Sequence, residues 1–88
     1  MTEDYLIAFS SFYKAAYAQE KLSEAGIKTI AKRLPPEVIN SCGYALTLKS
    51  GADQINNANR VLQSSDISHK GIFLISEVNG KTLYRKVK

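Results

Sequence analysis

The sequence predicts a small α+β domain of the ferredoxin-like, split βαβ type (βαββαβ) with an extra C-terminal hairpin strand. Residues 12–25 carry apolar side chains at three- and four-residue steps, which is typical of a helix packed on one side. Short apolar runs rich in strand-forming residues lie before and after it. Asn79-Gly80 is a strong signal for a two-residue hairpin turn. With 88 residues the chain forms one domain, 1–88.

The first strand is expected over 5–9, where the run Tyr-Leu-Ile-Ala-Phe is apolar throughout. Ser10 and Ser11 follow, and serine is a favoured residue at helix N-caps. The helix then runs from residue 12 to residue 25. Gly26 stands where a glycine commonly ends a helix.

The middle of the chain is expected to hold two strands joined by a loop. Residues 27–32 alternate apolar and polar side chains, which favours a strand. Two consecutive prolines make 34–41 a loop, because proline cannot donate to a strand ladder. The run 43–48 is the next strand.

A second helix is expected after Ser50, because 50–53 match a capping box with Asp in place of Glu. Ile55, Ala58 and Leu62 share one face of this helix, which ends within 63–66. The last elements are a strand over 71–75, the hairpin turn, and a strand over 82–87.

This order matches a split βαβ core over about 5–76, with a hairpin strand at 81–88 added to it. Right-handed crossovers make the first and third strands antiparallel neighbours. Both helices are expected to cover one face of the sheet.

The formal net charge is +4, and basic residues are concentrated at the C-terminus. The last eight residues hold Lys81, Arg85, Lys86 and Lys88 and no acid. This pattern suits either a patch for nucleic acid or an acidic partner, or a solvated strand that resists edge pairing. We favour the second interpretation, because no nucleic-acid-binding motif accompanies the charge.

Neither a membrane span nor a secretory signal is predicted. The chain has no apolar run of about 18 residues, and its N-terminus is acidic rather than basic. We therefore expect a cytoplasmic protein.

Cys42 is the most conspicuous chemical group in the sequence. A lone cysteine cannot form an internal disulfide, and one cysteine with one histidine does not supply a metal site. Phosphate-binding loops and Ser-His-Asp patterns are also missing from the sequence. Most enzyme classes are disfavoured, and no cofactor is expected.

The predicted topology places Cys42 where the third strand begins, beside the end of the first strand and the start of the first helix. Ser10, Ser11 and the first free helix amides should then lie near the thiol, with His69 at the same end of the sheet. A thiol near a helix N-terminus has a lowered pKa and forms the nucleophilic thiolate more readily.

Each of these residues also has a plainer interpretation. A free cysteine is often a small core residue, although the flanking Ser41 and Gly43 favour exposure. His69 is more simply an exposed loop residue than a proton donor. Lys32 and Arg33 either steer an anionic partner toward Cys42 or merely end a strand.

The segment Pro35-Pro36-Glu-Val-Ile-Asn-Ser-Cys42-Gly43-Tyr-Ala-Leu resembles the selenium/sulfur carrier-like family, whose hallmark is a proline followed by Ser-Cys-Gly and an apolar strand. The opening Leu-Ile-Ala-Phe and the helix that ends in Ala-Gly-Ile are similar to the family as well. The family often has a basic residue where this chain has Pro36.

The resemblance implies a carrier, at most sulfurtransferase-like, in which Cys42 accepts sulfur or selenium as a persulfide or selenosulfide. Its partners would be a protein donor and a protein acceptor. The expected binding residues are Ser10, Ser11, Ser41, Gly43 and His69. The alternative is a non-catalytic interaction module with an inert cysteine, which forms a homo-oligomer through the extra strand.

Overall fold

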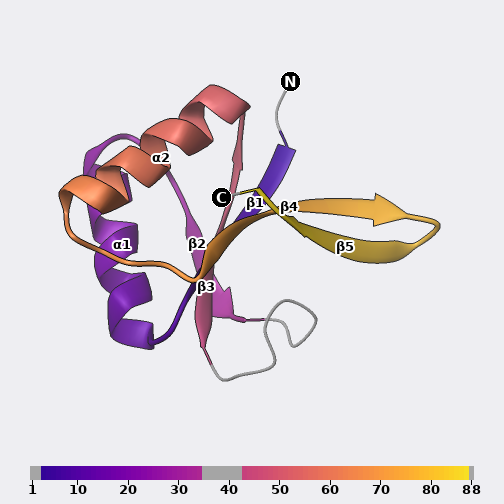
Figure 1. Ribbon diagram of the computed structural model, residues 1–88, viewed down its shortest axis with the longest axis horizontal. Helices are drawn as coiled ribbons and strands as arrows, with labels where there is room; N and C mark the ends of the chain where they lie inside the picture. The colour runs from indigo at the N-terminus through magenta and orange to yellow at the C-terminus, as the bar shows by residue number, and fades with distance from the viewer. Residues whose placement is uncertain (1–2, 35–42, 88) are drawn as a thin grey trace.

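The computed structural model describes residues 3–34 and 43–87, which form an α+β fold of two layers. One layer is a five-stranded antiparallel sheet, and the other is a pair of helices that lie together on one side of it (Figure 1). In chain order the elements are β1 (Glu3–Phe9), α1 (Phe12–Glu24), β2 (Ile30–Arg33), β3 (Tyr44–Ser50), α2 (Ala52–Ser64), β4 (Gly71–Val78) and β5 (Lys81–Lys86).

The strand order is β2-β3-β1-β4-β5. β1 lies between β3 and β4 and is antiparallel to both, so the predicted antiparallel pairing of the first and third strands is confirmed. The order has five strands rather than the four of a plain split βαβ unit, because β5 pairs with β4 and continues the sheet. The chain therefore brings its first strand to the middle of the sheet.

Helix α1 begins at Phe12 as predicted and ends at Glu24, one residue earlier than predicted, with Ala25 as its C-cap. The Ser11 hydroxyl oxygen accepts a hydrogen bond from the backbone N–H of Lys14 at 3.2 Å, as an N-cap does. At the other end, Gly26 has φ +82°, and the N–H of Ile27 bonds to the carbonyl of Leu22 at 2.8 Å. This is the bond pattern of a Schellman motif, which satisfies the last helix carbonyls.

The strand predicted over 27–32 begins later than expected. β2 starts at Ile30, because Ile27 closes the end of α1 through its backbone and its side chain is buried in the core. All four residues of β2 are exposed.

The predicted capping box of α2 is wrong. Ser50 remains in β3, where it pairs with Glu3, so the helix begins one residue later. Its N-cap is Gly51, which has no side chain to accept a hydrogen bond. Asp53 in the first turn still interacts favourably with the helix dipole.

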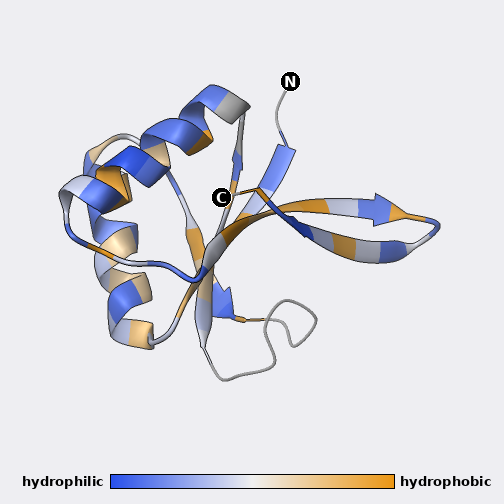
Figure 2. Cartoon of the chain, in the orientation of Figure 1, coloured by the Kyte–Doolittle hydropathy of each residue, from blue (hydrophilic) through white to orange (hydrophobic). Residues whose placement is uncertain are grey.

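The main core lies between the sheet and the helices, and Figure 2 shows hydrophilic and hydrophobic residues alternating along both helices. Ile7 and Phe9 face it from β1, and Leu22 and Leu62 face it from the helices; all four are fully buried. A smaller cluster occupies the opposite face of the sheet and is made of Leu6, Ala8, Leu34, Ala45 and Phe73.

The hairpin between β4 and β5 is confirmed. Asn79 and Gly80 have φ angles of +53° and +78°, the left-handed conformations of a type I′ turn. Strands β4 and β5 pair from Val78 and Lys81 at the turn to Phe73 and Lys86.

Candidate functional site

One end of the sheet gathers the elements that precede and follow Cys42. The last residue of β1, Phe9, pairs with Tyr44, the first residue of β3. Ala8 pairs with Gly71 at the start of β4, and the N–H of Lys70 donates to the Ala8 carbonyl at 2.7 Å. The start of α1 follows directly from β1. The expectation that these three strand ends meet beside the helix N-terminus is confirmed.

Gly43 is the described residue closest in sequence to the predicted nucleophile. Cys42 and Ser41 lie outside the described residues. The backbone of Gly43 is held from two sides: its carbonyl accepts a hydrogen bond from the N–H of Leu34 at 3.0 Å, and Phe9 crowds its α-carbon. The start of β3 is therefore fixed against the end of β1.

The crowding at Gly43 explains why this position is a glycine. A β-carbon there would lie 2.7 Å from the carbonyl oxygen of Phe9, closer than real contacts allow. From the sequence, Gly43 was expected to favour exposure of the neighbouring Cys42. The structure adds a packing reason, because no residue with a side chain fits beside the end of β1.

The two serines at the start of α1 differ in their surroundings. Ser11 is the N-cap, so its hydroxyl oxygen already accepts a bond from Lys14, while its own proton is still available for donation. Ser10 is exposed, in a bend between β1 and α1. Both lie at the sheet end occupied by Gly43, as expected.

Aromatic side chains surround the start of α1, a feature that the sequence analysis missed. The ring of Phe12 packs edge-on against Tyr44 at a centroid distance of 5.3 Å and against Tyr13 at 6.1 Å. Phe12 and Tyr13 nevertheless remain 51% and 83% exposed. Their positions off the apolar stripe of the helix were the signal for this exposure.

His69 is not the exposed loop residue that was favoured from sequence. It is half-buried, and its Nε2 lies 3.0 Å from Oδ1 of Asn59 on α2. Burial, followed by the nearby charge of Lys86, lowers the pKa of the imidazole. The ring is therefore neutral near pH 7, and its hydrogen bond ties it to α2. No contact in the described part of the chain links it to Gly43.

Lys32 and Arg33 are exposed on β2, beside the start of β3. Arg33 pairs directly with Tyr44, the residue after Gly43, and Lys32 pairs with Ala45. These two cations are thus close to Gly43 through the strand register. They remain candidates for attracting an anionic partner.

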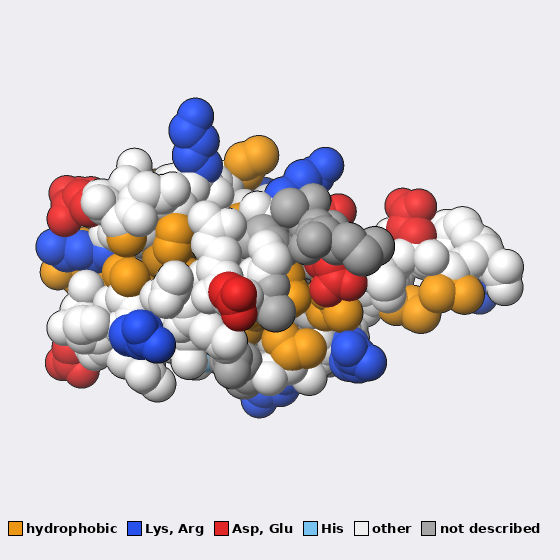
Figure 3. Space-filling view, turned by 90° about the horizontal axis from the view of Figure 1, so that it is seen from above, with side chains coloured by type: hydrophobic (Ala, Val, Ile, Leu, Met, Phe, Trp, Pro, Cys, Tyr) orange, Lys and Arg blue, Asp and Glu red, His pale blue; other side chains and the backbone are white. Residues whose placement is uncertain are grey.

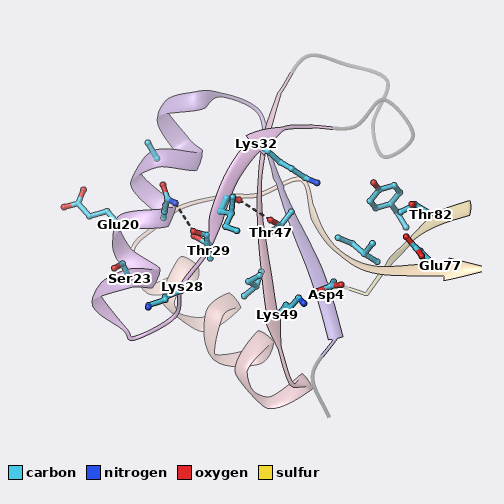
Figure 4. A pocket seen from close by; sticks show the side chains of 16 residues that line it. Asp4, Glu20, Ser23, Lys28, Thr29, Lys32, Thr47, Lys49, Glu77 and Thr82 are labelled. Atoms are coloured by element: carbon cyan, nitrogen blue, oxygen red, sulfur yellow. Dashed lines mark hydrogen bonds between the residues drawn. The ribbon is translucent and has the colours of Figure 1, made fainter. Parts of the chain in front are cut away.

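A hollow in the described part of the surface lies along β2 (Figure 4). The hollow extends to both sides of β2. One part is lined by residues of α1 and of the segment before β2 (Gln19, Ser23 and Lys28), and the other by residues of the remaining strands (Asp4, Lys49, Glu77 and Thr82). Gly43, Ser10, Ser11 and His69 do not line it. Of the described candidate residues around Gly43, Lys32 alone also lines this hollow.

Residues 3–34 and 43–87 also bear on metal binding and membrane insertion. These residues contain no group of three or more His, Cys, Asp or Glu side chains able to hold a metal ion. Neither helix is long and apolar enough to cross a membrane.

Comparison with known proteins gives one positive result. Residues 4–74 match the model of the family described as "Putative Se/S carrier protein-like". The searches of curated proteins and of solved structures found no match. The match covers most of the chain and ends within β4, so β5 lies outside it.

Proposed function

Because the chain belongs to the selenium/sulfur carrier-like family, we propose that it carries sulfur or selenium on Cys42 between a protein donor and a protein acceptor. The observation that carries this proposal is the packing of Gly43 against the Phe9 carbonyl, beside the N-terminus of α1. Cys42 directly precedes Gly43 in the sequence.

The proposed loading step is an attack of the Cys42 thiolate on the outer sulfur of a donor cysteine persulfide. A new S–S bond forms on Cys42, the S–S bond of the donor breaks, and the donor leaves as a thiolate. No external oxidant is needed, because the sulfane sulfur moves at its existing oxidation level. A selenium atom would follow the same course and leave a selenosulfide.

The surroundings of Gly43 suit an anionic sulfur. The unpaired N–H groups at the start of a helix favour negative charge and lower the pKa of a nearby thiol. Ser10, Ser11, Ser41 and the amide of Gly43 are the proposed donors to the terminal atom. Arg33 and Lys32 add positive charge nearby. His69 has no direct role in this scheme, because it is neutral and bonded to Asn59.

The exposed rings of Phe12 and Tyr13 support a protein partner. Aromatic side chains are enriched at the centres of protein interfaces, where they contribute much of the binding energy. Rings at the start of α1 would contact a donor or acceptor whose own cysteine reaches Cys42. A lone thiol that exchanges sulfur works in a reducing compartment, so we place the carrier in the cytoplasm.

We also propose that residues up to the end of β4 form a ferredoxin-like split βαβ unit, to which β5 is an addition. Support comes from the central position of β1 between β3 and β4 and from the two helices that share one face. The split unit coincides closely with the residues that match the family.

The test is to load the carrier in solution. The protein is incubated with a cysteine desulfurase and L-cysteine, and its intact mass is recorded without reductant. We expect the mass of one added sulfur atom on the parent and none on Cys42→Ser. An unchanged parent mass, or an equal gain on the variant, would overturn the proposal.

The rate of alkylation measured against pH separates the carrier from an inert interaction module. A carrier thiol should react with an apparent pKa below the ordinary value of about 8.5. A value at or above that would favour the module. Ser11→Ala, which removes a proposed donor and the helix cap, should raise the apparent pKa.

A further inference from the structure

Strands β4 and β5 continue past the rest of the sheet as a two-stranded arm. The last pairing of β4 with β1 joins Ile75 to Asp4, so residues 76–83 pair only with one another. Figure 1 shows this arm projecting from the body of the molecule. A two-stranded ribbon is only marginally stable in water by itself, so a third strand would stabilise it.

The arm exposes apolar side chains on one side. Val78, Leu83 and Val87 are 51%, 48% and 40% exposed. By the alternation of strands they lie on the same face as Ile72, beyond the part that the helices cover. Figure 3 shows hydrophobic side chains gathered along one side of the arm. An interaction partner would remove these groups from water.

The outer edge of β5 also has backbone groups that point away from β4. The N–H of Val87 donates to the carbonyl of Ile72 at 2.8 Å, which identifies the inward-bonding positions of the ladder. In an antiparallel pair these positions alternate with outward-facing ones. The N–H and C=O of Thr82 and Lys86 therefore face outward, ready to pair with a further strand.

The positive charge of β5 indicates what kind of strand would pair with its outer edge. β5 carries Lys81, Arg85 and Lys86 and no acidic residue. The opposite edge strand, β2, carries Lys32 and Arg33 and no acid either. Two copies of the chain that joined through these edges would place like charges opposite one another, which is unfavourable. An acidic strand would instead pair with each cation.

We propose that β5 is a docking edge for an extended, acidic segment of a partner protein, which adds to the sheet as a sixth strand. Such strand addition takes its affinity from main-chain hydrogen bonds and its specificity from alternate side chains. The fitting segment has acids opposite Lys81, Arg85 and Lys86 and apolar residues opposite Leu83 and Val87. Because β5 lies outside the residues that match the carrier family, this docking is independent of the sulfur chemistry.

The probe is a fluorescent peptide with the sequence Val-Glu-Glu-Tyr-Val-Thr-Glu, which is complementary to β5 read from Val87 to Lys81. Its binding is followed by fluorescence anisotropy, with the Lys-for-Glu version of the peptide as the control. The acidic peptide should bind at least about tenfold more tightly, and its Kd should rise with salt. Equal binding of the two peptides, or none by either, would overturn the proposal.

Thr82→Pro tests the backbone contact. It deletes an outward N–H while leaving the bonds between β4 and β5 intact, because that N–H does not pair with β4. The acidic peptide should bind about fivefold more weakly or worse, whereas Thr82→Ala should bind like the parent. The amide NMR spectrum verifies that both variants are folded. If folded Thr82→Pro binds normally, strand addition at β5 is wrong.

A second pair of variants tests the charges. Arg85→Glu/Lys86→Glu should abolish most of the binding. Lys28→Glu/Lys32→Glu, with Lys32 on β2 and Lys28 just before it, changes the net charge equally and should have little effect. Equal losses would indicate attraction by overall charge and overturn the proposal. Analytical sedimentation tests whether a second copy of the chain binds the β5 edge instead. If the parent forms a dimer and Thr82→Pro does not, the edge binds a second copy, and the proposal of an acidic partner segment is overturned.

Discussion

The end of the sheet at Gly43 and the arm that ends at Gly80 are both made of antiparallel strands, but they constrain their residues differently. At the first end, a backbone carbonyl of β1 touches Gly43 and leaves no room for a side chain. At the tip of the arm, no described residue other than Gly80 and its two chain neighbours has an atom within 4 Å of the β-carbon position of Gly80. At the residues that follow Cys42, close packing determines which side chains fit. In the arm, backbone conformation and contact with water determine which residues are accepted.

The largest expected effect on the free energy of unfolding comes from replacing leucine by alanine in the packed body, compared with the same replacement in the arm. Leu62→Ala removes a fully buried side chain of α2 and should lower the free energy of unfolding by about 2–5 kcal/mol. Leu83→Ala, on the half-exposed side of the arm, should change it by no more than about 0.5 kcal/mol. Urea denaturation followed by circular dichroism measures both. Equal losses would show that the arm is packed as tightly as the body.

The next largest effects on stability come from replacing Gly43, where steric crowding is the cause, and Gly80, where backbone conformation is the cause. Gly43→Ala should destabilise by about 1–3 kcal/mol, because the new methyl group meets the Phe9 carbonyl at 2.7 Å. Gly80→Ala should cost about 1–2 kcal/mol, because alanine resists a φ of +78°.

Asparagine distinguishes the two causes, since it tolerates the left-handed conformation but is larger than alanine. Gly80→Asn should therefore be more stable than Gly80→Ala. Gly43→Asn should be no more stable than Gly43→Ala. The comparison of the two regions fails if asparagine restores stability at both positions, as judged by the urea midpoints.

The smallest effect concerns pH and His69, close to the end at Gly43. Its pKa is lowered in the folded protein by burial and then by Lys86, so the unfolded chain binds a proton more readily. Stability due to this residue is complete above the ordinary pKa of 6.5 and is lost as pH falls from there toward the lowered value. His69→Gln should therefore reduce the loss of stability between pH 7.5 and about pH 5.5. A loss equal to that of the parent would contradict this prediction.

Much of the fold could be predicted because local signals and tertiary structure agree. The Ser11 cap, the end of α1 at Gly26 and the Asn79-Gly80 turn all depend on neighbouring residues, and each formed as expected. The error at the start of α2 arose where a distant partner decided the outcome. Ser50 looked like a helix cap, but its pairing with Glu3 keeps it in β3.

The candidate site was less predictable for the same reason. The order of strands was enough to bring Ser10 and Ser11 to the end of the sheet where β3 begins. The contact between Gly43 and the Phe9 carbonyl could not be foreseen, because it depends on the separation of two strands in space. The bond from His69 to Asn59 likewise joins residues ten positions apart, between α2 and the chain that follows it.

The central position of β1 also affects how the protein is made. β1 leaves the ribosome before both of its neighbours, β3 and β4, which lie far along the chain. Until residue 75 has emerged, its apolar run from Tyr5 to Phe9 lacks the complete set of strand partners that it has in the native sheet. Such a segment can pair wrongly with other chains while it waits.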